Sequence, residues 1–254
     1  MRPKYHQSEI KMFLMCGLSW QYRYVDKIRM PGSAAAMIGS VVDTGVSANL
    51  AQKVSSGIDL PVEQVLDVCA TDFEKRAQET VWDEDDQPGP SKDAALSVLK
   101  FHHLHVAPLI QPVTVQEQFV IETDAGYDLG GAIDYTDKAG FIGDTKTASR
   151  QKASSYSVNG AFQPALYSYA YNAIRGEPAK GFRFDIITRP TVKLGPEYKP
   201  ISGQVTEADH AWLFNGITRV HQAIQAGVAL PISEGHWKCS AKYCEYFSIC
   251  KGKK

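Results

Sequence analysis

The chain has 254 residues, of which 44% are apolar and 10% aromatic, and its 27 basic and 28 acidic residues leave a formal net charge of −1. This composition is typical of a folded protein with one large domain or two small ones, and it excludes an intrinsically disordered chain. The longest apolar stretch, near residues 34–42, is shorter than the roughly 18–20 residues of a membrane span. The N-terminus lacks the apolar core of a secretion signal, so we expect a cytoplasmic protein that does not enter a membrane.

The near-zero total hides an uneven distribution of charge. Residues 59–86 contain ten acidic and two basic residues, whereas residues 146–199 contain nine basic and three acidic ones. Both ends are basic as well: residues 1–30 contain six basic and two acidic residues, and residues 238–254 contain five basic residues and one acidic residue. We interpret the acidic block as a solvated face, which is the usual meaning of a charge run. The basic half is equally consistent with a solvated face and with a nucleic-acid footprint.

The first hundred residues predict helices. In residues 61–82, apolar side chains recur at intervals of three and four, which gives the helix one apolar face. Gly57 is placed to end the preceding helix, and Pro61 is tolerated in a first helical turn. The helices predicted in this part cover residues 8–16, 35–56, 61–82 and 91–105.

The apolar pattern changes to a period of two after residue 111, which predicts strands. Alternation places Glu117 on the apolar face of the first strand, together with Val113, Val115, Phe119 and Ile121. Further strands are predicted at 127–136, 141–147 and 182–186, and helices at 159–175 and between Thr206 and Gly227. We therefore expect an α/β protein whose central mixed β-sheet is flanked by helices.

A predicted hairpin brings two carboxylates together. If residues 138–140 form a three-residue loop with Gly140 in the left-handed conformation, the register places Asp134 directly opposite Asp144. Cross-strand neighbours have Cβ atoms roughly 4.5–5.5 Å apart. Two carboxylates at this distance repel each other unless a cation lies between them, and Mg²⁺ and Mn²⁺ prefer such oxygen ligands. The hairpin therefore predicts a divalent metal site.

A lysine and a third acid belong to the same candidate site. Lys146 lies two residues after Asp144 on one strand, so both side chains project from the same face. Glu117, on the apolar face of the preceding strand, is a candidate for a further ligand or a partner of a ligand. Each motif alone also fits an ordinary surface strand, because short motifs often occur by chance.

These motifs together resemble a known family. Gly130-Gly-Ala-Ile-Asp134, Asp144-Thr-Lys146 and Gln163-Pro-Ala-Leu-Tyr167 are similar to the PD-(D/E)XK nuclease superfamily, in its RecB- and Cas4-like exonuclease branch. The resemblance implies a restriction-endonuclease-like core in which Asp134, Asp144 and the carbonyl of Thr145 bind Mg²⁺ or Mn²⁺ and Lys146 positions water or stabilises charge. Relatives often carry Gly-x-x-x-His on an early helix, where this chain has Gly39-Ser-Val-Val-Asp43. Asp43 either binds metal through oxygen or contributes nothing.

The cysteines form a second candidate metal site. Cys16 stands near the start of the chain, and three cysteines stand near its end, at Cys239, Cys244 and Cys250. Such clustering in a cytosolic protein favours metal ligation over disulfides, and four thiolates suit either an iron–sulfur cluster or zinc. Cas4- and AddB-type nucleases are similar in layout, which implies a [4Fe–4S] cluster. The Cys-x₄-Cys spacing, where Cys-x₂-Cys is more usual, leaves zinc or an empty site open. Cys69 is expected to be a core thiol.

The resemblance implies a metal-dependent DNA nuclease, an exonuclease preferring single-stranded DNA or free ends, that acts in repair, recombination or replication. Alternatives are a Cas4-like end-processing subunit that works with an integration or recombination partner, and a nucleic-acid-binding module that does not cleave. Expected DNA contacts come from amide, phenol and basic side chains, namely Gln163, Tyr167, Arg150, Lys152, Tyr156 and Arg183. We expect one compact body made of a helical part at 1–110, a nuclease core at 111–230 and a cysteine-rich tail at 231–254.

Overall fold

The computed structural model describes residues 2–82, 84 and 86–251. Asp83, Asp85 and the lysines at 253 and 254, which belong to the charge runs of the sequence, lie outside the described residues. The chain divides into two compact units. Unit 1 contains Met1–Pro31, Val120–Gly131 and His210–Lys254, and unit 2 contains Gly32–Phe119 and Ala132–Asp209. Both ends of the chain thus belong to unit 1, whereas the long early helices belong to unit 2 together with most of the sheet.

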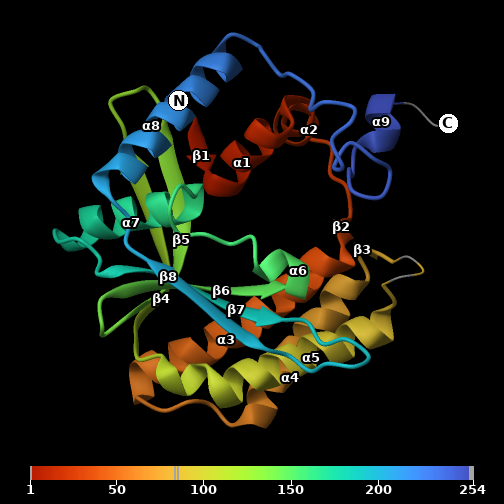
Figure 1. The fold of residues 1–254 in the computed structure, drawn as a ribbon, viewed down its shortest axis with the longest axis vertical. Coiled ribbons are helices and arrows are strands. Elements are labelled where there is room, and N and C mark those ends of the chain that lie inside the picture. Colours follow the sequence, from red (N-terminus) through yellow and green to blue (C-terminus); the bar gives the residue numbers. More distant parts are fainter. Residues whose placement is uncertain (1, 83, 85, 252–254) are drawn as a thin grey trace. The chain divides into compact units, whose positions relative to one another are not determined.

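Three helices form one layer of unit 2: α3 (Ala34–Ser56), α4 (Val62–Ala77) and α5 (Pro88–His105). They lie side by side in Figure 1 and bury a shared apolar cluster that includes Val41, Leu50 and Leu99. Gly57, at φ 78°, ends α3 in the left-handed conformation that glycine adopts without strain. By length and composition alone α3 could cross a membrane. Half of its most apolar window is buried within the protein, as in the core helix of a soluble protein.

A mixed sheet forms the second layer of unit 2. Its strands are β4 (Pro112–Glu122), β5 (Asp128–Asp137), β6 (Phe141–Ala148), β7 (Gly181–Thr188) and β8 (Tyr198–Gly203), paired in this order. The β5–β6 and β7–β8 pairs are antiparallel, whereas β6 and β7 are parallel. A parallel pair requires a long crossover, which here contains α6 (Arg150–Ala153) and α7 (Phe162–Arg175). The expected α/β fold with a central mixed sheet flanked by helices is confirmed.

The two faces of this sheet are covered by different helices. Tyr135 of β5 and Ile187 of β7 belong to the apolar cluster of α3, α4 and α5. On the other face, the Tyr167 ring of α7 lies 6.4 Å from the ring of Phe182. Because Phe182 pairs with Ile142 and Phe184 pairs with Asp144 in the parallel β6–β7 ladder, the face that α7 covers also carries Asp144 and Lys146.

Strand β4 does not keep one face throughout, which corrects the predicted alternation. Val115 packs against the α3–α5 cluster, whereas the Phe119 ring contacts Tyr167 of α7 on the opposite face. Residues four apart on a regular strand share a face, but Gln116 has φ 51° and interrupts the alternation like a β-bulge. Val113 is 45% exposed. Glu117, two residues before Phe119, therefore lies on the α7 side of the sheet.

Unit 1 joins the two ends of the chain. Strand β1 (Lys4–His6) pairs in parallel with the start of β5 and was not expected from the sequence. Helix α8 (Glu207–Gln225) begins at a capping box, in which the side chains of Thr206 and Asp209 each accept a hydrogen bond from the other residue's backbone N–H. Tyr5, Tyr127 and His221 pack their rings together.

The remaining elements of unit 1 are α1 (Gln7–Met15), α2 (Gly17–Trp20), the π-helix η1 (Gln21–Val25) and α9 (Phe247–Lys251). Those of unit 2 are β2 (Gly32–Ser33), β3 (Thr80–Val81) and η2 (Ala107–Leu109).

Candidate active site

The hairpin between β5 and β6 has the register that the sequence predicted. Gly140 has φ 85°, and its N–H donates to the carbonyl of Asp137 at 3.0 Å. Tyr135 pairs with Gly143 and Thr136 pairs with Ile142. Counting back one pair in the same register places Asp134 opposite Asp144. A left-handed glycine closing a three-residue loop thus fixes which two carboxylates meet.

The two carboxylates and the lysine form one hydrogen-bonded cluster. The Lys146 ammonium lies 2.8 Å from Oδ1 and 2.7 Å from Oδ2 of Asp144, whose side chain is fully buried. Burial, the charge of Asp144 and a hydrogen bond with Asp144 raise the pKa of Asp134 well above its ordinary value. Burial alone would lower the pKa of Lys146, but the charges of Asp144 and Asp134 outweigh it and raise this pKa. The cluster therefore holds a charged lysine, and Asp134 tends to keep a proton where no further cation is bound.

Several other predicted residues surround this cluster. Burial raises the pKa of Tyr167 to about 12, with a further increase from Asp134, while a hydrogen bond with Gln163 lowers it. Burial also raises the pKa of Tyr156, and the charges of Lys146 and Asp144 reach its hydroxyl. On α3, burial and the charge of Asp144 raise the pKa of Asp43. The structure thus brings Tyr167 of α7, Tyr156 of a loop and Asp43 of α3 into the electrostatic range of the carboxylates and the lysine.

Glu117 has other partners than the two aspartates. Its carboxylate forms an ion pair of 2.5 Å with Arg175, at the end of α7, and accepts a hydrogen bond of 3.0 Å from Thr114. This pairing was not predicted, because the left-handed Gln116 changes the face to which Glu117 belongs. The catalytic role predicted for Glu117 has no support in these contacts.

The basic residues predicted to contact DNA are in different environments. Lys152 is exposed on α6. Arg150 forms an ion pair with Glu197 and donates to the carbonyl of Gly195 at 2.6 Å. Arg183 lies on the sheet face opposite Asp144, where its Nε donates to Asp185 at 3.0 Å. Of these three residues, the structure therefore leaves Lys152 most accessible to a phosphate, and it does not bring Arg183 to the carboxylates.

A buried polar network lies on the sheet face opposite Asp144, and the sequence did not predict it. The fully buried Asp185 accepts hydrogen bonds from Arg183 and from the hydroxyls of Tyr135 and Tyr198, the last at 2.6 Å. This network joins β5, β7 and β8. A Cβ on Gly143 would lie 1.8 Å from the Tyr135 ring, so only glycine leaves room for the ring. The charged residues within the apolar run of β7 were a signal that this strand carries more than core packing.

The comparison with protein families agrees with this geometry. The family model of the PD-(D/E)XK nuclease superfamily matches residues 6–251. The chain belongs to the PD-(D/E)XK nuclease superfamily. Nucleases of this superfamily use divalent metal ions such as Mg²⁺ or Mn²⁺, and they act on DNA. Asp134, Asp144 and Lys146, which the sequence predicts to be the Asp, the second acid and the Lys of the superfamily's motif, lie within the matched residues.

One solved structure is similar in fold. A crystal structure named "Putative exonuclease", from Eubacterium rectale, is 15% identical to this PD-(D/E)XK nuclease, with a TM-score of 0.59. The match covers 92% of this chain and 86% of the other. A second structure, SSO0001, matches over 97% and 96% of the two chains at 14% identity, but its TM-score of 0.38 is too low to carry an argument. None of the curated proteins matches the chain.

The carboxylates of Asp134 and Asp144 suit a divalent ion that needs only a few ligands from the protein. Over the described part of the chain, no three His, Cys, Asp or Glu side chains gather closely enough to hold a metal by themselves. Mg²⁺ commonly takes only one or two carboxylates and fills its other positions with water and substrate phosphate oxygens. Asp134 and Asp144 meet this requirement, because two hard oxygen donors with mutual repulsion lie side by side. The residues present therefore fit such an ion.

The four predicted cluster cysteines share one environment in unit 1. Cys16, Cys239, Cys244 and Cys250 all line one cavity of about 40 Å³, and Cys69 lies apart, fully buried in the α3–α5 cluster. Burial alone would raise the pKa of Cys16, but hydrogen bonds from Ser19 and from backbone groups outweigh it and lower this pKa. A lowered thiol pKa favours the thiolate that ligates metals. All five cysteines are free.

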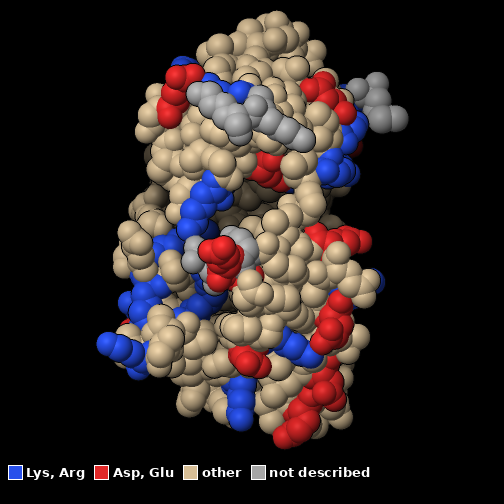
Figure 2. Space-filling view, turned by 90° about the vertical axis from the view of Figure 1, so that its right-hand side faces the viewer, with Lys and Arg blue, Asp and Glu red and all other residues tan. Residues whose placement is uncertain are grey.

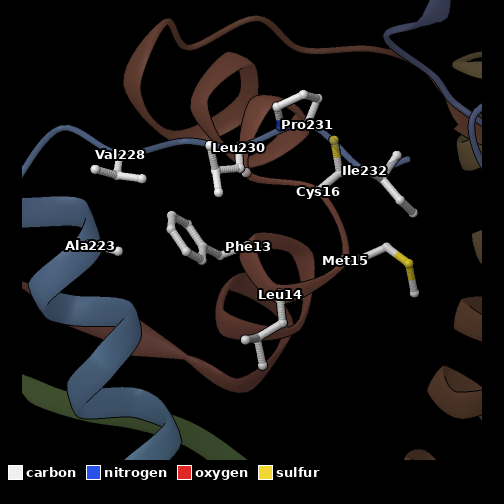
Figure 3. Close-up of a pocket in the computed structure, with 10 residues that line it drawn as sticks. Phe13, Leu14, Met15, Cys16, Ala223, Val228, Leu230, Pro231 and Ile232 are labelled. Atoms are coloured by element: carbon white, nitrogen blue, oxygen red, sulfur yellow. The ribbon is translucent and has the colours of Figure 1, made fainter. Parts of the chain in front are cut away.

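A larger apolar cavity of about 380 Å³ lies beside Cys16 in unit 1. Figure 3 shows Phe13 pointing toward Ala223 of α8 and toward Val228, with Cys16 and Pro231 farther along the wall. No member of the PD-(D/E)XK motif lines this cavity. It is therefore separate from the candidate active site.

Replacing Asp134 by Asn should raise the thermal stability of the nuclease at pH 7 in metal-free buffer. The pKa of Asp134 is raised in the folded state, so the folded protein holds this proton more tightly than the unfolded chain does. The protonated carboxyl therefore stabilises the fold below the unfolded-state pKa of about 4, and this contribution to the free energy of unfolding is lost as the pH rises through the folded-state pKa. Asn does not titrate, so the difference in Tm should be positive at pH 7 and should shrink toward pH 4. Thermal melts across this range test it. Equal Tm values at every pH would contradict the like-charge geometry.

Proposed function

We propose that this nuclease hydrolyses phosphodiester bonds of DNA with Mg²⁺ or Mn²⁺, and that it is an exonuclease preferring single strands or free ends. DNA repair, recombination or replication is the expected context. The observation that carries the proposal is the hydrogen-bonded cluster of Asp134, Asp144 and Lys146 on the hairpin of β5 and β6. Two repelling carboxylates beside a partly buried, charged lysine contribute little to a stable core, and their arrangement suits phosphate chemistry.

Each residue of the cluster has a distinct task in this proposal. Asp134, Asp144 and the carbonyl of Thr145 would hold the metal ion, and a bound ion would lower the pKa of water and neutralise charge on the phosphate. Lys146, oriented by its two contacts with Asp144, would stabilise the negative charge that develops on the attacked phosphate. Asp43 is close enough to affect Asp144 electrostatically, and it is a candidate for a further oxygen donor.

The surroundings of the cluster supply groups suited to hold a DNA strand. Gln163 and Tyr167 of α7 hydrogen-bond to each other beside Asp134, and both can donate to phosphate oxygens. Tyr156 has a ring contact of 5.3 Å with Phe184 and would offer a face for stacking on a base. In the lower half of Figure 2, Lys and Arg side chains gather along one edge and Asp and Glu along the opposite edge. Such separation would orient a polyanion.

The experiment is a cleavage assay on DNA labelled at either end. With Mn²⁺ the wild type should degrade single-stranded DNA faster than duplex DNA, release short products from one end, and stop when EDTA is added. Internal fragments would overturn the exonuclease assignment but not the nuclease. Binding without any cleavage would favour a nucleic-acid-binding module. Trimming that occurs only with a stoichiometric protein partner would favour a Cas4-like end-processing subunit.

We also propose that Cys16, Cys239, Cys244 and Cys250 bind a [4Fe–4S] cluster, with zinc as the alternative. Their common cavity and the lowered pKa of Cys16 support this assignment. Backbone N–H groups that bond to a cysteine sulfur are also a known means of tuning such clusters. When bound, the cluster would link the two ends of the chain within unit 1.

Protein purified without oxygen should contain iron and show a broad absorption near ~400 nm. Cys244→Ser should lose the iron and lower the Tm, because it removes a ligand from a site that stabilises the folded state. Cys69→Ala is the matched control and should keep its iron, since Cys69 is outside the cavity. Zinc in place of iron would select the alternative. Neither metal in freshly purified wild type would contradict the assignment.

A further inference from the structure

Two large aromatic side chains are exposed on the segment between α8 and α9. Trp237 is 63% exposed and Tyr243 is 54% exposed. Tyr246, on the same segment, is by contrast buried, and its hydroxyl donates to the carbonyl of Ile28 at 3.0 Å. A tryptophan ring left in water forgoes the free energy that burying it would contribute, because large aromatic rings dominate the energetics of cores and interfaces. The two rings therefore require an explanation beyond packing.

The two rings are held in a fixed arrangement. The Trp237 and Tyr243 ring centroids lie 5.2 Å apart at 81°, an edge-to-face contact, and the His236 ring lies 5.5 Å from Trp237 at 33°. Consecutive turns hold the backbone between them. Cys239 N–H donates to the carbonyl of His236 at 2.8 Å, and Ser240 Oγ donates to the carbonyl of Trp237 at 3.0 Å. A ligand that met this surface would lose little entropy in ordering it.

Two lysines flank the rings in sequence, and the acids on either side, Glu234 and Glu245, both pair with basic side chains. Lys238 follows Trp237 directly, and Lys242 precedes Tyr243. The nearest acid in sequence to Tyr243 is Glu245, which lies 3.6 Å from the Arg23 guanidinium. Exposed aromatic rings beside lysines are the combination that binds single-stranded nucleic acids, since bases stack on the rings and phosphates meet the cations. A purely apolar protein partner would gain nothing from these charges.

We infer that Trp237 and Tyr243 form a stacking platform for the bases of single-stranded DNA. The inference rests on the proposed nuclease function, because it names a second place where the same substrate is held. Trp237 contributes the larger ring and the larger exposed area. Every base has a face that can stack on these rings, so the platform accepts any base sequence.

Binding to labelled oligothymidine, measured by fluorescence anisotropy, tests the inference. All variants carry Asp144→Asn in the full chain, and no divalent metal is added, so cleavage does not interfere. Trp237→Leu should weaken binding roughly 5- to 100-fold, which corresponds to the loss of stacking on about one base. Trp237→Phe should restore most of it. Trp212→Leu is the matched control, because Trp212 is 46% exposed on α8, and it should bind as the parent does.

A second oligonucleotide of the same length, with abasic sites in place of the bases, separates stacking from phosphate contacts. The parent and Trp237→Leu should bind it equally, because it offers phosphates but nothing to stack. Equal binding of oligothymidine by the parent and Trp237→Leu would overturn the platform while leaving the nuclease intact. An equal loss on both oligonucleotides would also overturn it. If the wild type neither binds nor cleaves DNA, the proposed function fails as well.

Discussion

Asp144→Asn and Lys146→Met should each lower the rate of Mn²⁺-dependent cleavage by about 10³-fold or more. Removing a single preorganised group that stabilises transition-state charge typically costs about 10²–10³ in rate, and Asp144 both faces Asp134 and holds Lys146. The two variants should fail for different reasons. Asp144→Asn should also lose affinity for Mn²⁺, whereas Lys146→Met keeps both carboxylates and should still bind the ion.

Asp67→Asn is the control for these variants, because Asp67 is exposed on α4 and takes no part in the cluster. It should cleave at the wild-type rate. Circular dichroism and thermal melts of all variants show whether the fold survives. Loss of activity together with loss of fold would not support a catalytic role, so the comparison is made on folded protein only.

Gly143→Ala should lower the free energy of unfolding by about 3–5 kcal/mol. The added Cβ would lie 1.8 Å from one atom of the Tyr135 ring and 2.2 Å from its hydroxyl oxygen. The Tyr135 side chain must then move, and the buried Asp185 loses one of its hydrogen-bond donors. Overpacking costs about 1–3 kcal/mol, and a buried polar group left without its partner costs about 1–3 kcal/mol more.

Denaturant unfolding of Gly143→Ala beside Gly39→Ala gives the measurement and its control. A Cβ on Gly39, within α3, would meet no atom within 4 Å. This substitution should therefore be neutral or stabilise the protein by up to about 1 kcal/mol, because alanine is the better helix former. A Gly143→Ala variant as stable as Gly39→Ala would show that the Tyr135 ring is not held between β6 and β7 as described.

The sequence was most informative where local geometry decides the structure. The loop of residues 138–140 needs a left-handed Gly140, and that one requirement determines the register that opposes Asp134 to Asp144. Likewise, Gly57 was enough to predict where α3 ends, because the helix stops at Ser56 directly before it. Patterns of this kind depend on neighbours in the chain, so they can be read without the fold.

The errors concern contacts between distant residues. A left-handed Gln116 changes the face of β4, and nothing in the side chain of glutamine predicts this conformation. Glu117 consequently meets Arg175, 58 residues away, instead of Asp134 and Asp144. Arg183 looked like a phosphate contact because it is basic, but it bonds to Asp185 on its own strand and to the hydroxyl of Tyr135, and the contact with Tyr135 becomes apparent only in the folded sheet. Strand β8 was missed because Pro200 interrupts its pattern, as is permitted on an edge strand.

The single-turnover cleavage rate of Lys146→Met, measured beside the wild type on labelled single-stranded DNA at saturating Mn²⁺, tests the catalytic assignment most directly. The variant keeps Asp134 and Asp144 and removes only the ammonium that the structure holds at Asp144. We expect it to bind Mn²⁺ and DNA as the wild type does and to cleave at least about 10³-fold more slowly. Cleavage by the folded variant at the wild-type rate would contradict the assignment of this cluster as the catalytic centre.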